Sequence, residues 1–376
     1  SYIKQNMKVS EPLLMDYAVG KGGDLSKWAH ANMHFVFGID VHEDNITNSH
    51  DGACVRYLRW RHKNKKHPMR ALFLEGNSSL NIRVDGTAFK NSMHHEVAQC
   101  VFGQNKNPNK KYAFAHGIAK EGFHISSCMF ALHYFFENQH TLHAFLKNLA
   151  ECTRLHGYFI GTCFDGEKIF EFLHKRDNGT LIQRDESIRI DKNGRKMFEI
   201  TKKYDSTLSN FHADESSIGL PILVFQESID KHFIEYLVNF KYFVQLMENY
   251  GFVLVEKNEH QNMGFHESSG LFNRLYGMMQ NEIQNDEDVL NEYRNAPNMS
   301  SFEKTVSFLN RYFIFKKVRE LSQVSLNQME TILVKEKEEK EEQEPNVNSN
   351  NKNTVPKNRK KLKHAKIKLV KEPTVP

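Results

Sequence analysis

A strand pattern that runs into three glycines and then a helix pattern limits most strongly how this chain can fold. Residues 13–28 read LLMDYAVGKGGDLSKW, with glycines at 20, 22 and 23. This order opens the βαβ unit of nucleotide-binding folds, in which the backbone amides of the turn approach the ligand. The chain is therefore expected to begin with such a unit.

Strand-like and helix-like segments go on alternating through the first half of the chain. Strands are expected at 13–19, 34–40, 71–76, 123–136 and 157–164, and the fourth of these is expected to run into a loop. An amphipathic helix is expected between the last two. Strands that alternate with crossover helices form a mainly parallel sheet, so an α/β protein is predicted.

The middle of the chain differs, because apolar and polar residues alternate from 176 to 205. Asn-Gly turn signals at 178–179 and 193–194 predict antiparallel hairpins. We interpret a segment of about 176–232 as an insertion that folds over the sheet. A helix that starts near Asn239 and late strands at 252–257 and 312–318 are then expected.

The composition changes again near residue 320. Residues 320–376 are rich in charged residues and asparagine and contain no aromatic residue, so this tail is predicted to be disordered. Its Lys-rich second half could contact RNA phosphates or could simply keep the chain soluble. The folded domain is placed at 1–319, and a chain that starts without Met is expected to be one domain of a longer polypeptide.

The bulk composition narrows the class of protein. A net charge of +5 and a pI near 8.7 allow an anionic partner without requiring one. The five cysteines form no CxxC pair, and no HExxH motif accompanies His94, His95 and Cys100, so no metal site is expected. No apolar run approaches the ~18 residues of a membrane span, so no membrane partner is expected.

The glycine loop fits neither of two common phosphate-binding motifs. GKGGD is not the GxxxxGK[ST] of a P-loop, nor the GxGxxG of a dinucleotide site. Asp40 ends the second predicted strand, where a carboxylate accepts hydrogen bonds from ribose hydroxyls. This pattern favours a nucleoside cofactor such as S-adenosyl-L-methionine, and a purely structural turn is the alternative.

Five segments together resemble the mRNA cap guanine-N7 methyltransferase family, most of all the versions in cytoplasmic large DNA viruses. They are LLMDYAVGKGGDLSKW, FGIDVHEDNI, SSCMFALHYFFE, GYFIGTCFDGEKI and FIEYLVNFKYFVQLMENYGFVLVEK, and the similarity runs to about Lys317. The resemblance implies a Rossmann-like class I AdoMet-dependent methyltransferase, α/β with a mostly parallel seven-stranded sheet and an antiparallel hairpin insertion.

The resemblance also implies partners and a location. It implies the capped 5′ end of mRNA as substrate, S-adenosyl-L-methionine as cofactor, and triphosphatase and guanylyltransferase domains in the same polypeptide. It places the protein inside the cell, and for a viral protein in the cytoplasmic viral factory or the virion. It leaves open whether a stimulatory subunit takes part.

Carried over residue by residue, the family pattern gives two sets of site residues. The expected cofactor-binding residues are Lys4, Ala18, Gly20, Gly22, Asp40, Asn77, Met129 and Tyr134. The expected cap-binding residues are Lys21, Lys27, Arg56, Phe130, His133, Tyr134 and Glu235. Taken singly, Phe130 could be a core aromatic, His133 a satisfied buried histidine and Glu235 a solvent-facing helix charge.

Three positions depart from the family pattern. Asn77 stands where the family has aspartate, Met129 where it has glutamine, and Asn310 where it has tyrosine. A strand interpretation puts Asn310 on one face with Phe308 and Tyr312. We therefore expect the cap to depend more on the aromatic residues, and a tyrosine at 310 to be tolerated.

The implied reaction needs no acid or base from the protein. Guanine N7 carries a free lone pair and no proton, so the main requirement is alignment of the reacting atoms. A ribose 2′-O-methyltransferase would instead have to deprotonate a hydroxyl, and its Lys-Asp-Lys-Glu set cannot be placed here. A non-catalytic RNA-binding subunit with the same fold is the other alternative.

Overall fold

A computed structural model describes residues 7, 9–174, 187–192, 195–205, 207–208, 210–227, 229–291, 293–322 and 324–325. The chain divides into two units, Ser1–Ser322 and Gln323–Pro376. The first unit contains two sheets and the helices around them. Nearly all of the predicted tail, the predicted turns at 178–179 and 193–194, and Lys4 lie outside the described residues.

The first unit is built on a central sheet with the strand order β10-β12-β5-β4-β1-β2-β3. The five strands from β5 to β3 are parallel, whereas β12 is antiparallel to β5 and to β10. An eighth strand, β11, pairs with β12 beside this path. The bounds are β1 Leu13–Asp16, β2 Phe35–Asp40, β3 Arg70–Glu75, β4 Phe123–Met129, β5 Thr153–Phe164, β10 Phe252–Leu254, β11 Ser269–Leu271 and β12 Asn310–Lys317.

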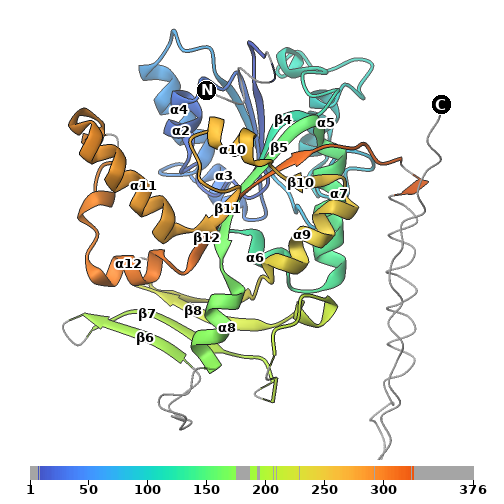
Figure 1. Ribbon diagram of the computed structural model, residues 1–376. Helices are drawn as coiled ribbons and strands as arrows, with labels where there is room; N and C mark the ends of the chain where they lie inside the picture. Colours follow the sequence, from blue (N-terminus) through green and yellow to red (C-terminus); the bar gives the residue numbers. More distant parts are fainter. Residues whose placement is uncertain are drawn as a thin grey trace, which may run out of the picture. The chain divides into compact units, whose positions relative to one another are not determined.

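Helices cover both faces of this sheet (Figure 1). They are α2 Leu25–His30, α3 Glu43–Thr47, α4 Ala53–Lys63, α5 Ser92–Val101, α6 Leu132–Phe135, α7 Gln139–Cys152, α8 Gly166–His174, α9 Phe240–Asn249, α10 Lys257–Asn262, α11 Phe272–Asn285 and α12 Ser301–Ser307. Short 3-10 turns lie at Ala113–Ala115, Glu215–Ser217, Glu287–Asn291 and Ala296–Asn298.

The alternation of side chains along each strand explains the two covered faces. On β2, Val36 packs into a cluster with Trp28 of α2 and Ala53 of α4. Its neighbour Phe37 points the other way and stacks on Phe123 of β4 at a centroid distance of 6.0 Å. Because successive side chains of a strand point to opposite faces, apolar residues at every position require helices on both sides.

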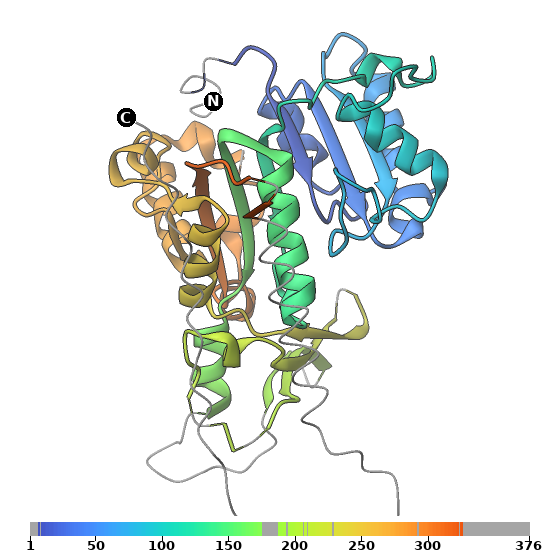
Figure 2. The same ribbon diagram turned by 90° about the vertical axis from the view of Figure 1, so that its right-hand side faces the viewer.

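A second, antiparallel sheet accounts for the predicted hairpins. Its order is β6-β7-β8-β9, with β6 Ser187–Lys192, β7 Arg195–Lys202, β8 Pro221–Gln226 and β9 Lys231–Tyr236. Figures 1 and 2 show it at the bottom of both views, near α8. Helix α6, which follows β4 of the central sheet, packs against β9 of the second sheet. The two sheets therefore meet at this helix.

The structure differs from the sequence-based expectations at the ends of several elements. The strand predicted at 123–136 ends at Met129, and α6 follows in place of a loop. Strand β5 begins at Thr153 rather than Gly157. The helix start predicted near Asn239 is confirmed, because the Asn239 side chain caps α9 by accepting a hydrogen bond from the Tyr242 N–H.

Within the described part of the chain, no helix is long and apolar enough to cross a membrane. The same residues contain no group of three or more His, Cys, Asp or Glu side chains placed to hold a metal ion. All five cysteines are free thiols.

Candidate functional site

The glycine loop leaves the carboxyl end of β1 and is held against the end of β2. Gly20 and Gly22 have φ of +52° and +68°, a conformation that glycine adopts at no steric cost. The Val19 N–H donates to the Ile39 carbonyl at 2.9 Å. A Cβ atom added at Gly20 or Gly23 would meet no atom of the described residues within 4 Å, so the loop borders open space.

Asp40 at the end of β2 is the main anchor of this loop. Its Oδ2 accepts the Gly20 N–H at 2.8 Å, and its Oδ1 accepts the His42 N–H at 3.0 Å and the Asn45 amide at 2.9 Å. The side chain is 7% exposed. A carboxylate has about four acceptor positions, so room for a ligand hydroxyl remains.

Asp16 at the end of β1 is a site residue that the sequence analysis missed. It accepts hydrogen bonds from the Ala18 N–H at 3.1 Å and the Ser127 hydroxyl at 3.0 Å. Burial raises the pKa of Asp16 to about 7, and the nearby charges of Asp24 and Asp40 act in the same direction. An acid at the end of the first strand, like Asp40 at the end of the second, was the signal that could have found it.

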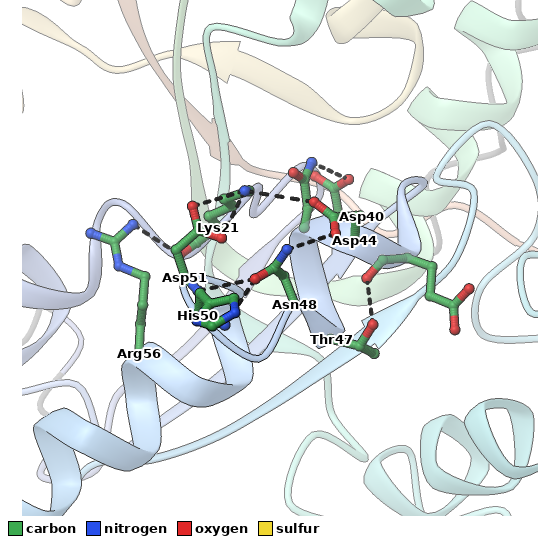
Figure 3. A network of polar contacts seen from close by, with 10 residues as sticks. Lys21, Asp40, Asp44, Thr47, Asn48, His50, Asp51 and Arg56 are labelled. Atoms are coloured by element: carbon green, nitrogen blue, oxygen red, sulfur yellow. Dashed lines mark hydrogen bonds and ion pairs between the residues drawn. The ribbon is translucent and has the colours of Figure 1, made fainter.

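The three basic residues expected at the cap already have partners near the glycine loop. Figure 3 shows two of them, Lys21 and Arg56. The Lys21 ammonium lies 2.8 Å from Asp51 and 3.6 Å from Asp44. The Arg56 guanidinium donates to the Lys21 carbonyl at 3.1 Å. Lys27 is exposed on α2 and pairs with Asp24 at 2.6 Å. A phosphate at Lys21 would therefore have to compete with Asp51.

The two cofactor positions that depart from the family pattern lie at the same edge of the sheet. Asn77 follows β3, and its Oδ1 accepts the Ser79 N–H at 2.9 Å. Met129 ends β4, and the Thr162 hydroxyl lies 3.9 Å from its sulfur. A cavity of about 510 Å³ is lined by Met129, Thr162 and Lys27 but by neither His133 nor Glu235.

Phe130 follows β4 in an unusual backbone conformation. Its φ is +55°, which is rare for a bulky residue, and its side chain is 54% exposed. The Phe130 N–H is fixed by the Thr162 carbonyl at 2.9 Å and the Thr162 hydroxyl at 3.1 Å. Strained backbone that presents an aromatic ring to solvent is typical of a ligand site. The core-aromatic alternative for Phe130 is therefore wrong.

His133 on α6 and Glu235 on β9 face each other in the interior. The His133 Nε2 and Glu235 Oε2 atoms are 3.4 Å apart, and the two residues are 4% and 8% exposed. Both His133 ring nitrogens and Glu235 Oε2 lack a hydrogen-bond partner among the described residues. His133 is therefore not a satisfied buried histidine, because its ring nitrogens have no hydrogen-bond partner among the described residues. Glu235 is not a solvent-facing helix charge, because it is buried and lies on a strand.

Burial decides the charge of this pair. It lowers the pKa of His133 to about 3 and raises that of Glu235 to about 8, so both side chains are neutral at pH 7. Buried polar atoms without a partner are rare and costly in native proteins. The cluster therefore offers unused donor and acceptor positions to a polar ligand.

Tyr134 lies next to His133 in this cluster. Its ring lies 4.2 Å from that of His133 by centroids, and the side chain is 45% exposed. Burial of the hydroxyl group, with the charges of Glu235 and Asp40, raises the pKa of Tyr134 to about 12. Both carboxylates are thus close enough to Tyr134 to influence its titration.

Arg311 and Asp165, also missed by the sequence analysis, hold the neighbouring strands together. The Arg311 Nε lies 2.6 Å from Asp165 Oδ2, and the Arg311 guanidinium lies over the Phe240 ring. Asn310 points elsewhere: its amide donates to the Ser307 carbonyl at 3.1 Å, at the end of α12, and the residue is 7% exposed. The predicted pairing of Asn310 with Phe308 on one strand face is wrong, because β12 begins at Asn310.

The fold assigns this protein to a class of enzymes, and its sequence assigns it to a family within that class. A doubly wound sheet with a glycine loop after its first strand and an acid after its second is the fold of class I AdoMet-dependent methyltransferases. The chain belongs to the mRNA (guanine-N(7))-methyltransferase family, whose sequence model matches residues 1–318.

Individual relatives are distant in sequence. A probable mRNA-capping enzyme of Acanthamoeba polyphaga mimivirus is 26% identical over 86% of this chain and 27% of its own length. The mRNA cap guanine-N(7) methyltransferase of Caenorhabditis briggsae is 30% identical over 43% of this chain and 33% of its own length. The chain thus spans about a quarter to a third of these relatives.

A solved structure gives a weaker likeness. The CcbJ methyltransferase from Streptomyces caelestis has a TM-score of 0.41 and 9% sequence identity, over 85% of this chain and 88% of its own. Membership in the family rests on the sequence match.

Proposed function

We propose that this domain transfers the methyl group of S-adenosyl-L-methionine to guanine N7 of the mRNA cap. The observation that carries the proposal is the buried pair His133 and Glu235. Both His133 ring nitrogens and Glu235 Oε2 have no hydrogen-bond partner among the described residues, and the partly exposed ring of Tyr134 lies against His133. Family membership names the reaction, and this pair supplies a place for a purine.

The residues around the glycine loop fit the cofactor. Asp40 has acceptor capacity left for ribose hydroxyls, and the open space at Gly20 and Gly23 lets a ligand approach the backbone. S-adenosyl-L-methionine, when bound, supplies an electrophilic methyl group on a sulfonium. Lys4, Ala18, Gly22, Asn77, Met129 and Tyr134 remain assigned to the same cofactor by resemblance.

Guanine recognition follows from the chemistry of the pair. The neutral His133 ring has one N–H, which can donate to the guanine carbonyl oxygen. Once Glu235 has lost its proton, its carboxylate can accept from guanine N1–H and the exocyclic amino group, and these two bonds form a charge-assisted contact. The contact strengthens as N7 methylation makes the base cationic, because the acceptor is held in position before the charge develops.

The aromatic residues act on the same developing charge. The faces of Phe130 and Tyr134 attract a cationic ring by their quadrupoles. Lys21, Lys27 and Arg56 would hold the triphosphate, and this orients N7 without any proton transfer. Alignment of this kind can account for about 7–11 kcal/mol of a reaction barrier.

The test is methylation of a GpppA-capped RNA with labelled S-adenosylmethionine, followed by digestion to nucleosides. Label in 7-methylguanosine supports the proposal. Label in a 2′-O-methyl nucleoside would assign the domain to ribose methylation. Absence of label together with S-adenosylhomocysteine binding by calorimetry would identify a non-catalytic RNA-binding subunit.

The wider setting of the domain is proposed on the same basis. The mimivirus relative is named as a capping enzyme, and most of its length lies outside the match. We infer that triphosphatase and guanylyltransferase domains can share a polypeptide with this domain, which we place at 1–319 with an insertion near 176–232 and a tail at 320–376. The expected location is inside the cell and, for a viral protein, the cytoplasmic viral factory or the virion.

A further inference from the structure

Helix α4 and the loop that follows it carry a local excess of positive charge. Residues 52–74 contain four arginines and three lysines and no aspartate or glutamate. The whole chain, in contrast, has 51 basic and 46 acidic side chains. This segment is therefore strongly basic in a chain whose charges nearly balance.

Three of the four arginine and lysine residues of α4 lie on one face of the helix. Arg56, Arg59 and Lys63 are spaced i, i+3 and i+7, and all three are exposed. The opposite face packs Tyr57 and Trp60 against the core. Two more exposed lysines follow the helix, and we call the whole set the basic strip: Arg56, Arg59, Lys63, Lys65 and Lys66.

The basic strip begins at the candidate site. Arg56 donates to the Lys21 carbonyl of the glycine loop, as Figure 3 shows. Arg59 donates to the His50 carbonyl at 2.6 Å. Among the described residues, no carboxylate forms an ion pair with any member of the strip, whereas Lys21 and Lys27 both have one. The strip is thus an unneutralised extension of the phosphate side of the site.

We propose that the basic strip binds the backbone of the RNA chain that follows the cap. This inference rests on the proposed function, because it takes the capped end as held at Arg56. From Arg56 to Lys63 the helix axis rises about 10 Å, and Lys65 and Lys66 continue the positive charge beyond the end of α4, so the strip is long enough to contact several nucleotides in a row. Contacts to phosphates carry no base information, so the binding is independent of sequence.

A membrane surface is a less suitable partner for the basic strip than a nucleic acid. A helix that lies on a membrane inserts an apolar face, and the apolar face of α4 is buried in the domain. Leu58 is the one large apolar side chain of this helix among the exposed hydrophobic residues of the described chain. An anionic polymer is the partner that this surface fits.

The test compares a GpppG dinucleotide with a capped RNA of 20 nucleotides as substrates of the full chain, from 50 to 200 mM salt. With one single-strand phosphate contact each at Lys63, Lys65 and Lys66, the log–log slope of kcat/KM against salt should be steeper for the RNA by about 2, which is about a 16-fold change over this range. The triple variant Lys63→Glu, Lys65→Glu, Lys66→Glu should lose this difference and keep its kcat/KM for the dinucleotide.

The matched control reverses three exposed lysines of another loop, Lys106, Lys110 and Lys111. It should keep the wild-type difference between the two substrates. Equal slopes for both substrates in the wild type, or an equal loss in the control, would overturn the inference. If neither substrate is methylated, the proposed function fails instead, and fluorescence anisotropy with a labelled uncapped RNA still decides whether the strip binds RNA.

Discussion

Replacing Glu235 with glutamine keeps the size of the side chain and removes its ability to ionise. Glu235 is 8% exposed, and its Oε2 has no hydrogen-bond partner among the described residues. Glutamine would offer guanine one acceptor oxygen, and its own amino group would face the second hydrogen-bond donor of guanine. A hydrogen bond to a charged group contributes about 1.5–3 kcal/mol, so kcat/KM for capped RNA should fall about 10- to 150-fold. Affinity for S-adenosylhomocysteine should not change.

The pH dependence gives this prediction a second readout. Burial raises the pKa of Glu235 to about 8, so the carboxyl group holds its proton in the free protein at pH 7. Guanine requires the carboxylate, and binding therefore releases that proton. The kcat/KM of the wild type should rise with pH toward about 8 and then level off, and Glu235→Gln should lack this rise.

Folding stability should decrease as pH rises, whereas kcat/KM should increase. Between the ordinary pKa of 4.5 and the raised value of about 8, the folded protein holds a proton that the unfolded chain has lost. The free energy of unfolding contributed by this group is therefore fully present below 4.5 and is lost as pH rises through the folded pKa. Melting curves of Glu235→Gln should show a smaller decline over this range.

The assay is initial-rate methyl transfer from pH 6 to 9, with calorimetry for the cofactor product. Glu227→Gln is a matched control, because Glu227 adjoins the same antiparallel sheet and pairs with Arg195 at its surface. A parallel loss of S-adenosylhomocysteine affinity and turnover, or an unchanged pH profile in Glu235→Gln, would refute the assignment of Glu235 to guanine.

Four further substitutions test other parts of the site. Asp40→Ala should weaken S-adenosylhomocysteine binding by about 1.5–3 kcal/mol, because ribose loses a charged acceptor and the Gly20 N–H loses its anchor; unchanged calorimetry in a folded variant would contradict this. Tyr134→Ala should lower kcat/KM for capped RNA by a factor equivalent to about 1–3 kcal/mol of binding energy. Asn310→Ala should lower the melting temperature instead, because the Asn310 amide faces α12. Equal losses of kcat/KM in the two variants would contradict these separate roles. Phe130→Gly should reduce turnover without lowering the melting temperature, because glycine relieves the positive φ; a clear loss of stability would show that the ring supports the fold.

The parallel half of the fold could be predicted because its strands are short and apolar on both faces. Consecutive apolar residues such as Phe35 and Val36 point to opposite faces of the sheet, and both are buried only when helices cover both faces. The helix cap at Asn239 was also predictable from local chemistry. The strand β11 was not, because its three residues contain a glycine and gain their order only from pairing with β12.

The candidate site was predictable in its residue types but not in its environment. The resemblance selected His133 and Glu235, yet no local pattern shows that one lies on a helix and the other on a strand of a different sheet. The positive φ of Phe130 depends on its two bonds to Thr162, which is remote in sequence. A tyrosine at 310, expected from the sequence to be tolerated, would replace a buried amide that holds the end of α12.

The guanine pair is divided between two sheets, since His133 belongs to the helix after β4 and Glu235 to β9. The carboxyl group proposed for guanine is thus carried by a different sheet from the residues proposed for the cofactor. A piece that stopped before β9 would retain Gly20, Asp40 and His133 and would lack only the proposed partner of guanine N1–H. In such an arrangement a change in the small sheet can alter one edge of the proposed base contact, while the elements proposed to hold the methyl donor stay as they are.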